Sequence, residues 1–124
     1  MNVGIAGVGL SGNKVTFDED TATYRIRHNA AKHNTTLEFH VSGPYIQYIP
    51  ETVTVALKKS DGTIVDQVRL WAAHYDYGTL SDKIYHPNVV EDETLSLVYE
   101  YNGKWVDTGK KVVYEVYYAI SDYS

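Results

Sequence analysis

Apolar and polar residues alternate along most of this chain, most regularly in its last thirty residues. From Leu95 to Tyr101, and again over residues 112–120, every second side chain is a large apolar or aromatic one. Successive side chains of a β-strand point to opposite faces of the sheet, so this period of two predicts strands with one buried face. The same alternation upstream, at Leu37, Phe39 and Val41, predicts antiparallel strands with one wet face.

Nine segments fit this description, and turn residues separate them. We predict strands at residues 3–10, 14–17, 23–27, 35–41, 52–59, 63–71, 94–101, 104–107 and 111–120. The Asp61-Gly62 and Asn102-Gly103 pairs are typical of tight hairpins, and the run from Asp107 to Gly109 predicts a further break. No stretch has the length and period of an ordinary helix. The pattern predicts one all-β domain, an antiparallel β-sandwich, with a small barrel as the alternative.

The alternation fails between residues 72 and 92, where we predict a long loop containing a short edge strand at 83–86. This loop is rich in aromatic residues. Three interpretations are open: packing against the body of the domain, contact with a protein, or a platform for a sugar ring. The candidate ligand- or partner-binding residues are Trp71, His74, Tyr75, Asp76, Tyr77 and Tyr85, with Trp105 after the Asn102-Gly103 turn.

Residues 1–12 are apolar and glycine-rich, and we treat them separately from the domain at 13–124. They predict either a first strand or an arm that pairs with a neighbouring subunit. In the second case Val3, Ile5 and Val8 are the assembly residues. The segment lacks the basic start of a signal peptide and is too short to span a bilayer. Residues 7–12 spell G-x-G-x-x-G, but a strand pattern follows where a phosphate site needs a helix, so we expect no nucleotide site.

Composition narrows the function classes. The 124 residues carry a formal net charge of −5 with scattered basic residues, which argues against nucleic-acid binding. There is no cysteine, and the five histidines lack ligand spacing, so we expect no zinc. The acidic clusters at 18–20 and 91–93 are candidate calcium ligands, but neither has the spacing of an EF-hand loop. We expect no cofactor, no metal and no catalytic activity. Twelve tyrosines favour a broad contact surface instead.

The order of several motifs resembles the N-terminal domain of baseplate upper proteins from phages of Gram-positive hosts. The matching pieces are residues 24–27, 34–39, the hairpin at 53–66, and residues 97–104, 107–109 and 112–116. The resemblance implies an immunoglobulin-like sandwich in a virion tail, acting as a non-catalytic module that docks on neighbouring subunits. This chain ends at Ser124 without a stalk, and its loop at 72–92 is more aromatic than expected. The first departure argues against a linking role and favours a small decoration or adaptor protein.

These observations lead to an expected function. We expect a structural or interaction module of a phage particle, folded in the host cytoplasm, that assembles with itself or with other tail or capsid proteins. The alternative is a carbohydrate-binding module that uses the aromatic loop. A secreted adhesin or toxin component is a third and weaker hypothesis, because the chain lacks cysteines and a visible signal peptide.

Overall fold

The computed structural model describes residues 1–8, 13–44, 46 and 52–120. Within these residues it contains ten strands, and the 3₁₀ turn η2 (Ala72–His74) follows the sixth of them. The strands are β1 (Asn2–Val8), β2 (Lys14–Asp18), β3 (Thr23–Asn29), β4 (Thr36–Ser42), β5 (Val53–Lys58), β6 (Ile64–Leu70), β7 (Tyr75–Asp76), β8 (Thr79–Tyr85), β9 (Leu95–Tyr101) and β10 (Lys104–Tyr117). The all-β prediction is confirmed. Each predicted segment overlaps a strand, although residues 9 and 10 of the first lie outside the described residues.

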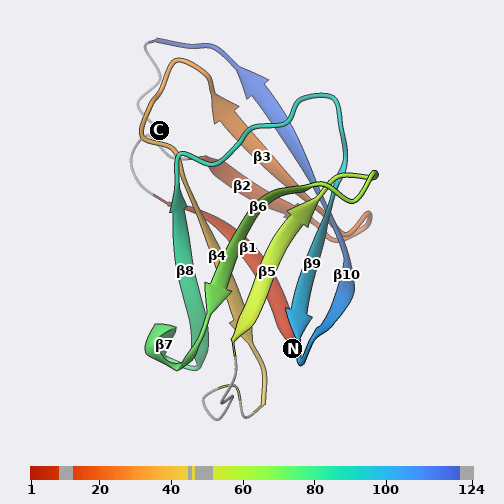
Figure 1. The fold of residues 1–124 in the computed structure, drawn as a ribbon. Helices are drawn as coiled ribbons and strands as arrows, with labels where there is room; N and C mark the ends of the chain where they lie inside the picture. The colour runs from red at the N-terminus through yellow and green to blue at the C-terminus, as the bar shows by residue number, and fades with distance from the viewer. Residues whose placement is uncertain (9–12, 45, 47–51, 121–124) are drawn as a thin grey trace.

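The strands form two sheets packed face to face (Figure 1). One sheet has the order β1-β4-β8-β7, and the other has the order β2-β3-β10-β9-β5-β6. The predicted sandwich is therefore confirmed, and the alternative of a barrel is wrong. The order is that of an immunoglobulin sandwich that has a C′ strand. β1, β4, β8 and β7 take the places of strands A, B, E and D, and β6, β5, β9 and β10 take the places of C′, C, F and G. The β2–β3 hairpin is an addition beside β10.

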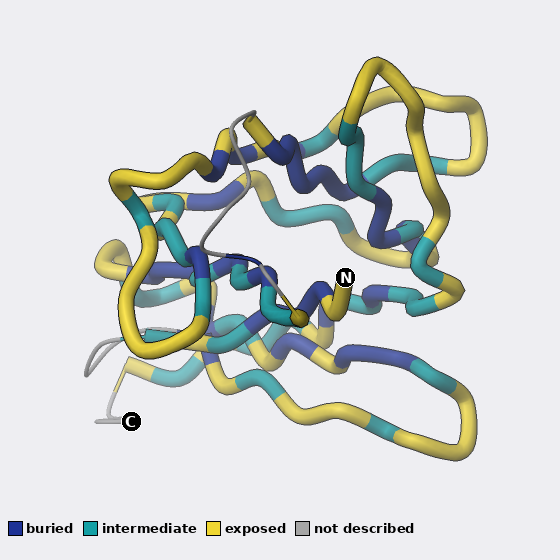
Figure 2. The backbone as a smooth tube through the Cα atoms, turned by 90° about the horizontal axis from the view of Figure 1, so that it is seen from below, coloured by how far each residue is buried: buried dark blue, intermediate teal, exposed yellow. Residues whose placement is uncertain are grey.

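The register explains which side chains form the core. Leu37, Phe39 and Val41 on β4 are fully buried, as are Val53, Val55 and Leu57 on β5. These alternate residues share the inner face of their sheets, as the period of two predicted. Buried segments lie toward the middle of the molecule and the exposed loops lie at its margins (Figure 2).

Strand β10 differs from the prediction in two ways, the direction of its pairing with β3 and its continuity across a predicted break. Its pairing with β3 is parallel, with Lys111 opposite Thr23, whereas every other pair of strands is antiparallel in the described residues. The predicted break at Asp107 to Gly109 is a bulge inside one long strand: β10 advances from Asp107 to Lys111 while β9 moves only from Val98 to Ser96. Gly109 has φ 80° there, and its N–H donates to Asp107 Oδ1 over 2.9 Å. The residues from Asp107 to Gly109, which are typical of a turn, therefore form a β-bulge inside a strand.

The predicted loop at 72–92 is wrong at residues 72–76 and 79–82, and the short strand predicted within it at 83–86 overlaps the end of β8. It contains η2, β7 and β8, and β8 pairs along its whole length with β4. The alternation was hidden because Asp82 occupies the position between Leu80 and Ile84 that faces the other sheet, opposite Phe39 on β4. A carboxylate fits there because it lies at the side of the sandwich, 3.6 Å from His74 Nε2.

Candidate functional site

The structure divides the predicted binding residues into three places. Five of them gather at one end of the sandwich, where β6 ends and β7 begins, and we call this group the aromatic tip. The aromatic tip consists of Trp71, His74, Tyr75, Asp76 and Tyr77. Tyr85 is excluded, because β8 carries it six residues away from the β7–β8 turn, which is about 20 Å along a strand. β7 marks the tip at the lower left of Figure 1.

The 3₁₀ turn η2 builds the first half of the tip. The backbone N–H of Trp71 donates to His74 Nδ1 over 3.2 Å, so that nitrogen carries no proton in this arrangement. The two rings meet edge to face with centroids 5.8 Å apart. The other ring nitrogen, Nε2, faces Asp82 on β8. His74 therefore fixes the direction of Trp71 and ties the turn to the four-stranded sheet.

The β7–β8 hairpin builds the second half of the tip. Asp76 pairs with Thr79, so Tyr77 and Gly78 form a two-residue turn. Both have positive φ, 48° and 83°, as a type I′ turn requires. Tyrosine rarely adopts this conformation, and its side chain is 96% exposed. The hairpin thus presents an aromatic ring to solvent on a backbone conformation that tyrosine adopts rarely.

The exposed rings define what the tip can do chemically. Trp71 is 53% exposed and Tyr75 is 40% exposed, next to the nearly free ring of Tyr77. Large rings at such exposure bury area on a partner protein or stack on the apolar face of a sugar. The described residues hold no group of three or more His, Cys, Asp or Glu side chains that could bind a metal ion. They also contain no helix long and apolar enough to cross a membrane.

Trp105 belongs to neither the tip nor the loop. It lies on the outer face of the six-stranded sheet, with Lys58 Nζ 4.3 Å from the centroid of its ring. By register Ala56 and Val98 lie between these two side chains on the same face, and they are 0% and 7% exposed. Trp105 therefore fits the role of a cover over its own sheet, held by a cation–π contact.

The three predicted assembly residues of the N-terminal segment do not form a free arm. Val3 and Ile5 are 2% and 5% exposed and belong to the core of their own chain, and Val8 is half-buried at the end of β1. β1 pairs with β4 along its whole length. The arm interpretation is corrected to a first strand, because apolar side chains at alternate positions face the core.

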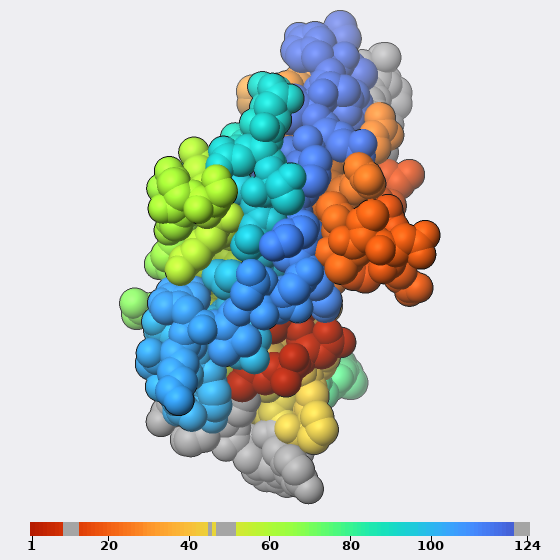
Figure 3. Space-filling view, turned by 90° about the vertical axis from the view of Figure 1, so that its right-hand side faces the viewer, coloured from red at the N-terminus to blue at the C-terminus, as the bar shows by residue number. Residues whose placement is uncertain are grey.

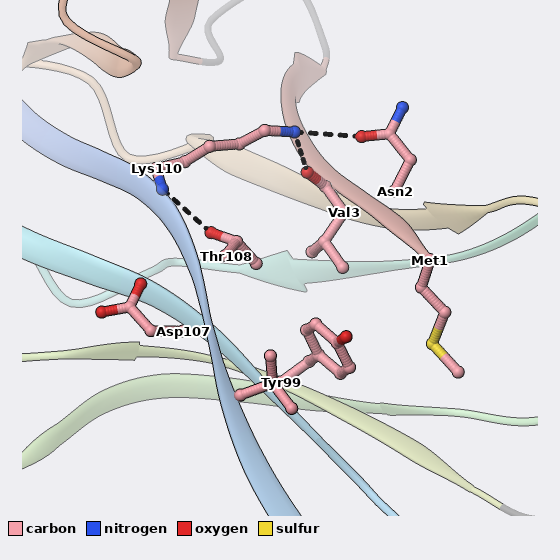
Figure 4. Close-up of a pocket in the computed structure, with 8 residues that line it drawn as sticks. Met1, Asn2, Val3, Tyr99, Asp107, Thr108 and Lys110 are labelled. Carbon is pink, nitrogen blue, oxygen red and sulfur yellow. Dashed lines mark hydrogen bonds between the residues drawn. The ribbon is translucent and has the colours of Figure 1, made fainter.

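The structure contains a cleft between β1 and the bulge of β10, which the sequence pattern does not predict (Figure 4). Its volume is about 250 Å³, below the range of about 300–1,000 Å³ usual for ligand pockets. Across it, Lys110 Nζ donates to the carbonyl oxygen of Val3 over 2.6 Å and to Asn2 Oδ1 over 3.0 Å. Burial lowers the pKa of Lys110. The ammonium group holds the edge of the sheet, and this use of the cleft is structural.

A buried polar cluster is the second feature that the sequence pattern did not reveal. Asp66, 8% exposed on β6, accepts hydrogen bonds from Asn88 N over 3.1 Å and from Asn88 Nδ2 over 2.9 Å. The Asn88 amide also donates to the carbonyl oxygen of Val65 over 3.1 Å. Desolvation raises the pKa of Asp66. Burial, and secondarily the charge of Asp66, raises the pKa of Tyr114. The cluster pins the β8–β9 connection to β6.

Comparisons with known proteins add no relative. No family model matches the chain, and no curated protein matches it.

Proposed function

We propose that this chain is a non-catalytic interaction module of a phage particle, and that the aromatic tip is its contact with a neighbouring protein. The particle context comes from the sequence resemblance to baseplate upper proteins. The tip supplies the contact surface. The observation that carries the proposal is Tyr77, an aromatic residue held at φ 48° and 96% exposed at the point of a hairpin.

The surroundings of Tyr77 support this role. Trp71 and Tyr75 add two exposed rings, and His74 holds the turn that presents them. Exposed tryptophan and tyrosine are the side chains that contribute most to protein–protein contacts when they are buried. The tip is built on short, tightly hydrogen-bonded turns, so little conformational entropy is lost when a partner covers it.

A carbohydrate-binding module is the second candidate. The observation that favours it is the set of exposed rings at the tip, with Tyr75 40% and Tyr77 96% exposed. Exposed aromatic rings can stack on the apolar face of a pyranose, whereas the carboxylate of Asp76 lies on the opposite face of β7 from Tyr75.

Light scattering over a concentration series, with a glycan panel on the same samples, tests the two candidates. A particle module is expected to form a defined assembly larger than a dimer, and Trp71→Ser and Tyr77→Ser are expected to reduce it. Tyr85→Ser is the matched control, because Tyr85 is an exposed tyrosine at the other end of β8. A glycan that binds the wild type and not Tyr75→Ser, without any assembly, would replace the first candidate by the second.

A further inference from the structure

The two sheets have four lateral edges, and three of them are closed. β1 is covered by Lys110, which bonds the Val3 carbonyl oxygen, and by Tyr24, whose hydroxyl makes a hydrogen bond with the Ile5 backbone. β6 is covered where Asn88 bonds the Val65 carbonyl oxygen. β7 is only two residues long. Natural sheets protect their edges by such means, because open strands pair with other chains.

The fourth edge, β2, packs against β1 near its start but forms no ladder with it. It pairs with β3 on one side, and its other side has no strand partner within the described part of the chain. The β2–β3 hairpin forms the right-hand margin of the molecule in Figure 3, on the far side of β10 from β5 and β6. Phe17 on this strand is 39% exposed although its ring contacts Tyr24 with centroids 4.6 Å apart.

The sequence of β2 is complementary to itself. It reads Lys-Val-Thr-Phe-Asp, residues 14–18. An antiparallel pair of two copies centred on Thr16 places Lys14 opposite the Asp18 of the second copy, and Asp18 opposite its Lys14. The same register places Val15 opposite Phe17 on the other face. Opposite charges and aromatic–β-branched pairs are both favourable across antiparallel strands.

We propose that β2 is a self-association edge, and that two copies of this chain pair there antiparallel about Thr16 to form one continuous sheet. The contact is isologous, so it closes as a two-fold dimer and does not propagate. The occupant is a second copy because the charge pattern of the strand matches its own reverse. The contact consists of strand pairing, two charge pairs and two apolar pairs. Because this interface is small, we expect a weak dimer whose population rises with protein concentration.

The charges of β2 have partners within the chain that a dimer must accommodate. Asp18 Oδ1 accepts from the backbone N–H of Asp20 over 3.0 Å, and Asp18 Oδ2 lies 3.9 Å from Arg25 on the neighbouring strand. The ion pair with Arg25 is exposed and long, so it contributes little and leaves the carboxylate available to Lys14 of the second copy.

Charge reversal at the two paired positions tests this register. By light scattering, Lys14→Glu and Asp18→Lys are each expected to raise the apparent dimer dissociation constant about tenfold or more, because each places two like-charge pairs in the dimer. An equimolar mixture of the two variants restores both attractive pairs and is expected to dimerise. The double variant Lys14→Glu/Asp18→Lys is expected to dimerise with itself.

Matched controls separate the register from net charge. Lys104→Glu changes the charge as Lys14→Glu does, at the exposed start of β10. Glu19→Lys does the same for Asp18→Lys, one residue beyond the strand. Both are expected to leave the dimer unchanged. A wild type that stays monomeric at every concentration, or variants that fail to rescue each other when mixed, would overturn the proposal.

This inference rests on the proposed assembly role, and its failure is distinguishable from the failure of that role. If β2 is wrong and the tip is right, Tyr77→Ser reduces assembly whereas the mixed β2 variants show no rescue. If the tip is wrong and β2 is right, the tip variants leave a dimer that the β2 variants dissociate.

Discussion

Lys110 Nζ donates a hydrogen bond of 2.6 Å to the carbonyl oxygen of Val3, which ties the last strand of one sheet to the first strand of the other. The bulge in β10 brings the lysine to this place, and it lies beside Phe17 and Tyr24 with its nitrogen 5.8 and 6.0 Å from their ring centroids. The bond occupies a polar backbone group on the outer side of β1. It therefore both closes the sandwich and protects the edge.

We expect Lys110→Met to lower the free energy of unfolding by about 1–2 kcal/mol, because the variant keeps the apolar stem and loses a charge-assisted hydrogen bond. Urea denaturation followed by circular dichroism measures the loss. Lys104→Met, at the exposed start of β10, is the control and should change stability by less than about 0.5 kcal/mol. Equal losses in the two variants would mean that the bond to Val3 does not stabilise the fold.

Two glycines of β1 should respond differently to alanine. A Cβ at Gly7 would clash with the backbone oxygen of Asn13, whereas at Gly4 the atom that it would meet first belongs to the side chain of His40. Backbone cannot move as cheaply as a side chain, so Gly7→Ala should cost about 3 kcal/mol and Gly4→Ala about 1 kcal/mol. Thermal denaturation of both variants gives the order, and a larger loss for Gly4→Ala would contradict the predicted packing.

The sequence predicts the strands whose alternation is complete and misses features built by single polar residues. The sequence predicts β5 correctly, because its alternation is uninterrupted: the apolar residues Val53, Val55 and Leu57 all face the core. The sequence predicts only the end of β8, as a short strand at 83–86, because Asp82 occupies a position that the pattern reserves for an apolar residue. The sequence predicts a break at the bulge, because the local chemistry at Gly109 is the same in a turn and in a bulge, and only the pairing of β10 with β9 on both sides of Gly109 continues the strand.

The candidate site was predictable in part for a similar reason. Local sequence brings Trp71 to Tyr77 together, since only two short turns separate them. Tyr85 and Trp105 were grouped with them on composition, and their places depend on pairing with β4 and β9, which no local pattern reveals. The partnership of Lys110 with Val3 joins residues at opposite ends of the chain and has no local signature at all.

The pH dependence of stability should report on Asp66. Desolvation raises its pKa in the folded state, so the folded chain binds a proton more readily than the unfolded chain. The stability contributed by this group is present below the ordinary aspartate pKa and is lost as pH rises through the raised folded pKa. In Asp66→Asn this loss should disappear.

The difference between the two unfolding free energies, measured by urea denaturation at a series of pH values, isolates Asp66 from the other carboxylates. The asparagine also loses one of the acceptors for Asn88, which shifts its stability at every pH and leaves the slope unaffected. A difference that stays constant over the acidic range would show that Asp66 does not titrate differently in the folded chain.

The last prediction concerns the strain at Tyr77. The chain contains a second two-residue hairpin turn, Asn102-Gly103, with φ 55° and 73°, nearly the values of Tyr77 and Gly78. Asparagine adopts positive φ more easily than tyrosine, so Tyr77→Asn should raise the free energy of unfolding by roughly 0.5–1 kcal/mol. The reciprocal variant Asn102→Tyr should lower the free energy of unfolding by a similar amount, and Tyr85→Asn, where φ is not positive, should not raise it.

If the tip is a contact surface, Tyr77→Asn gains stability and loses assembly in the same sample, because the strain is kept for an exposed ring. A stabilised variant that assembles as the wild type does would leave Tyr77 without a role in the contact.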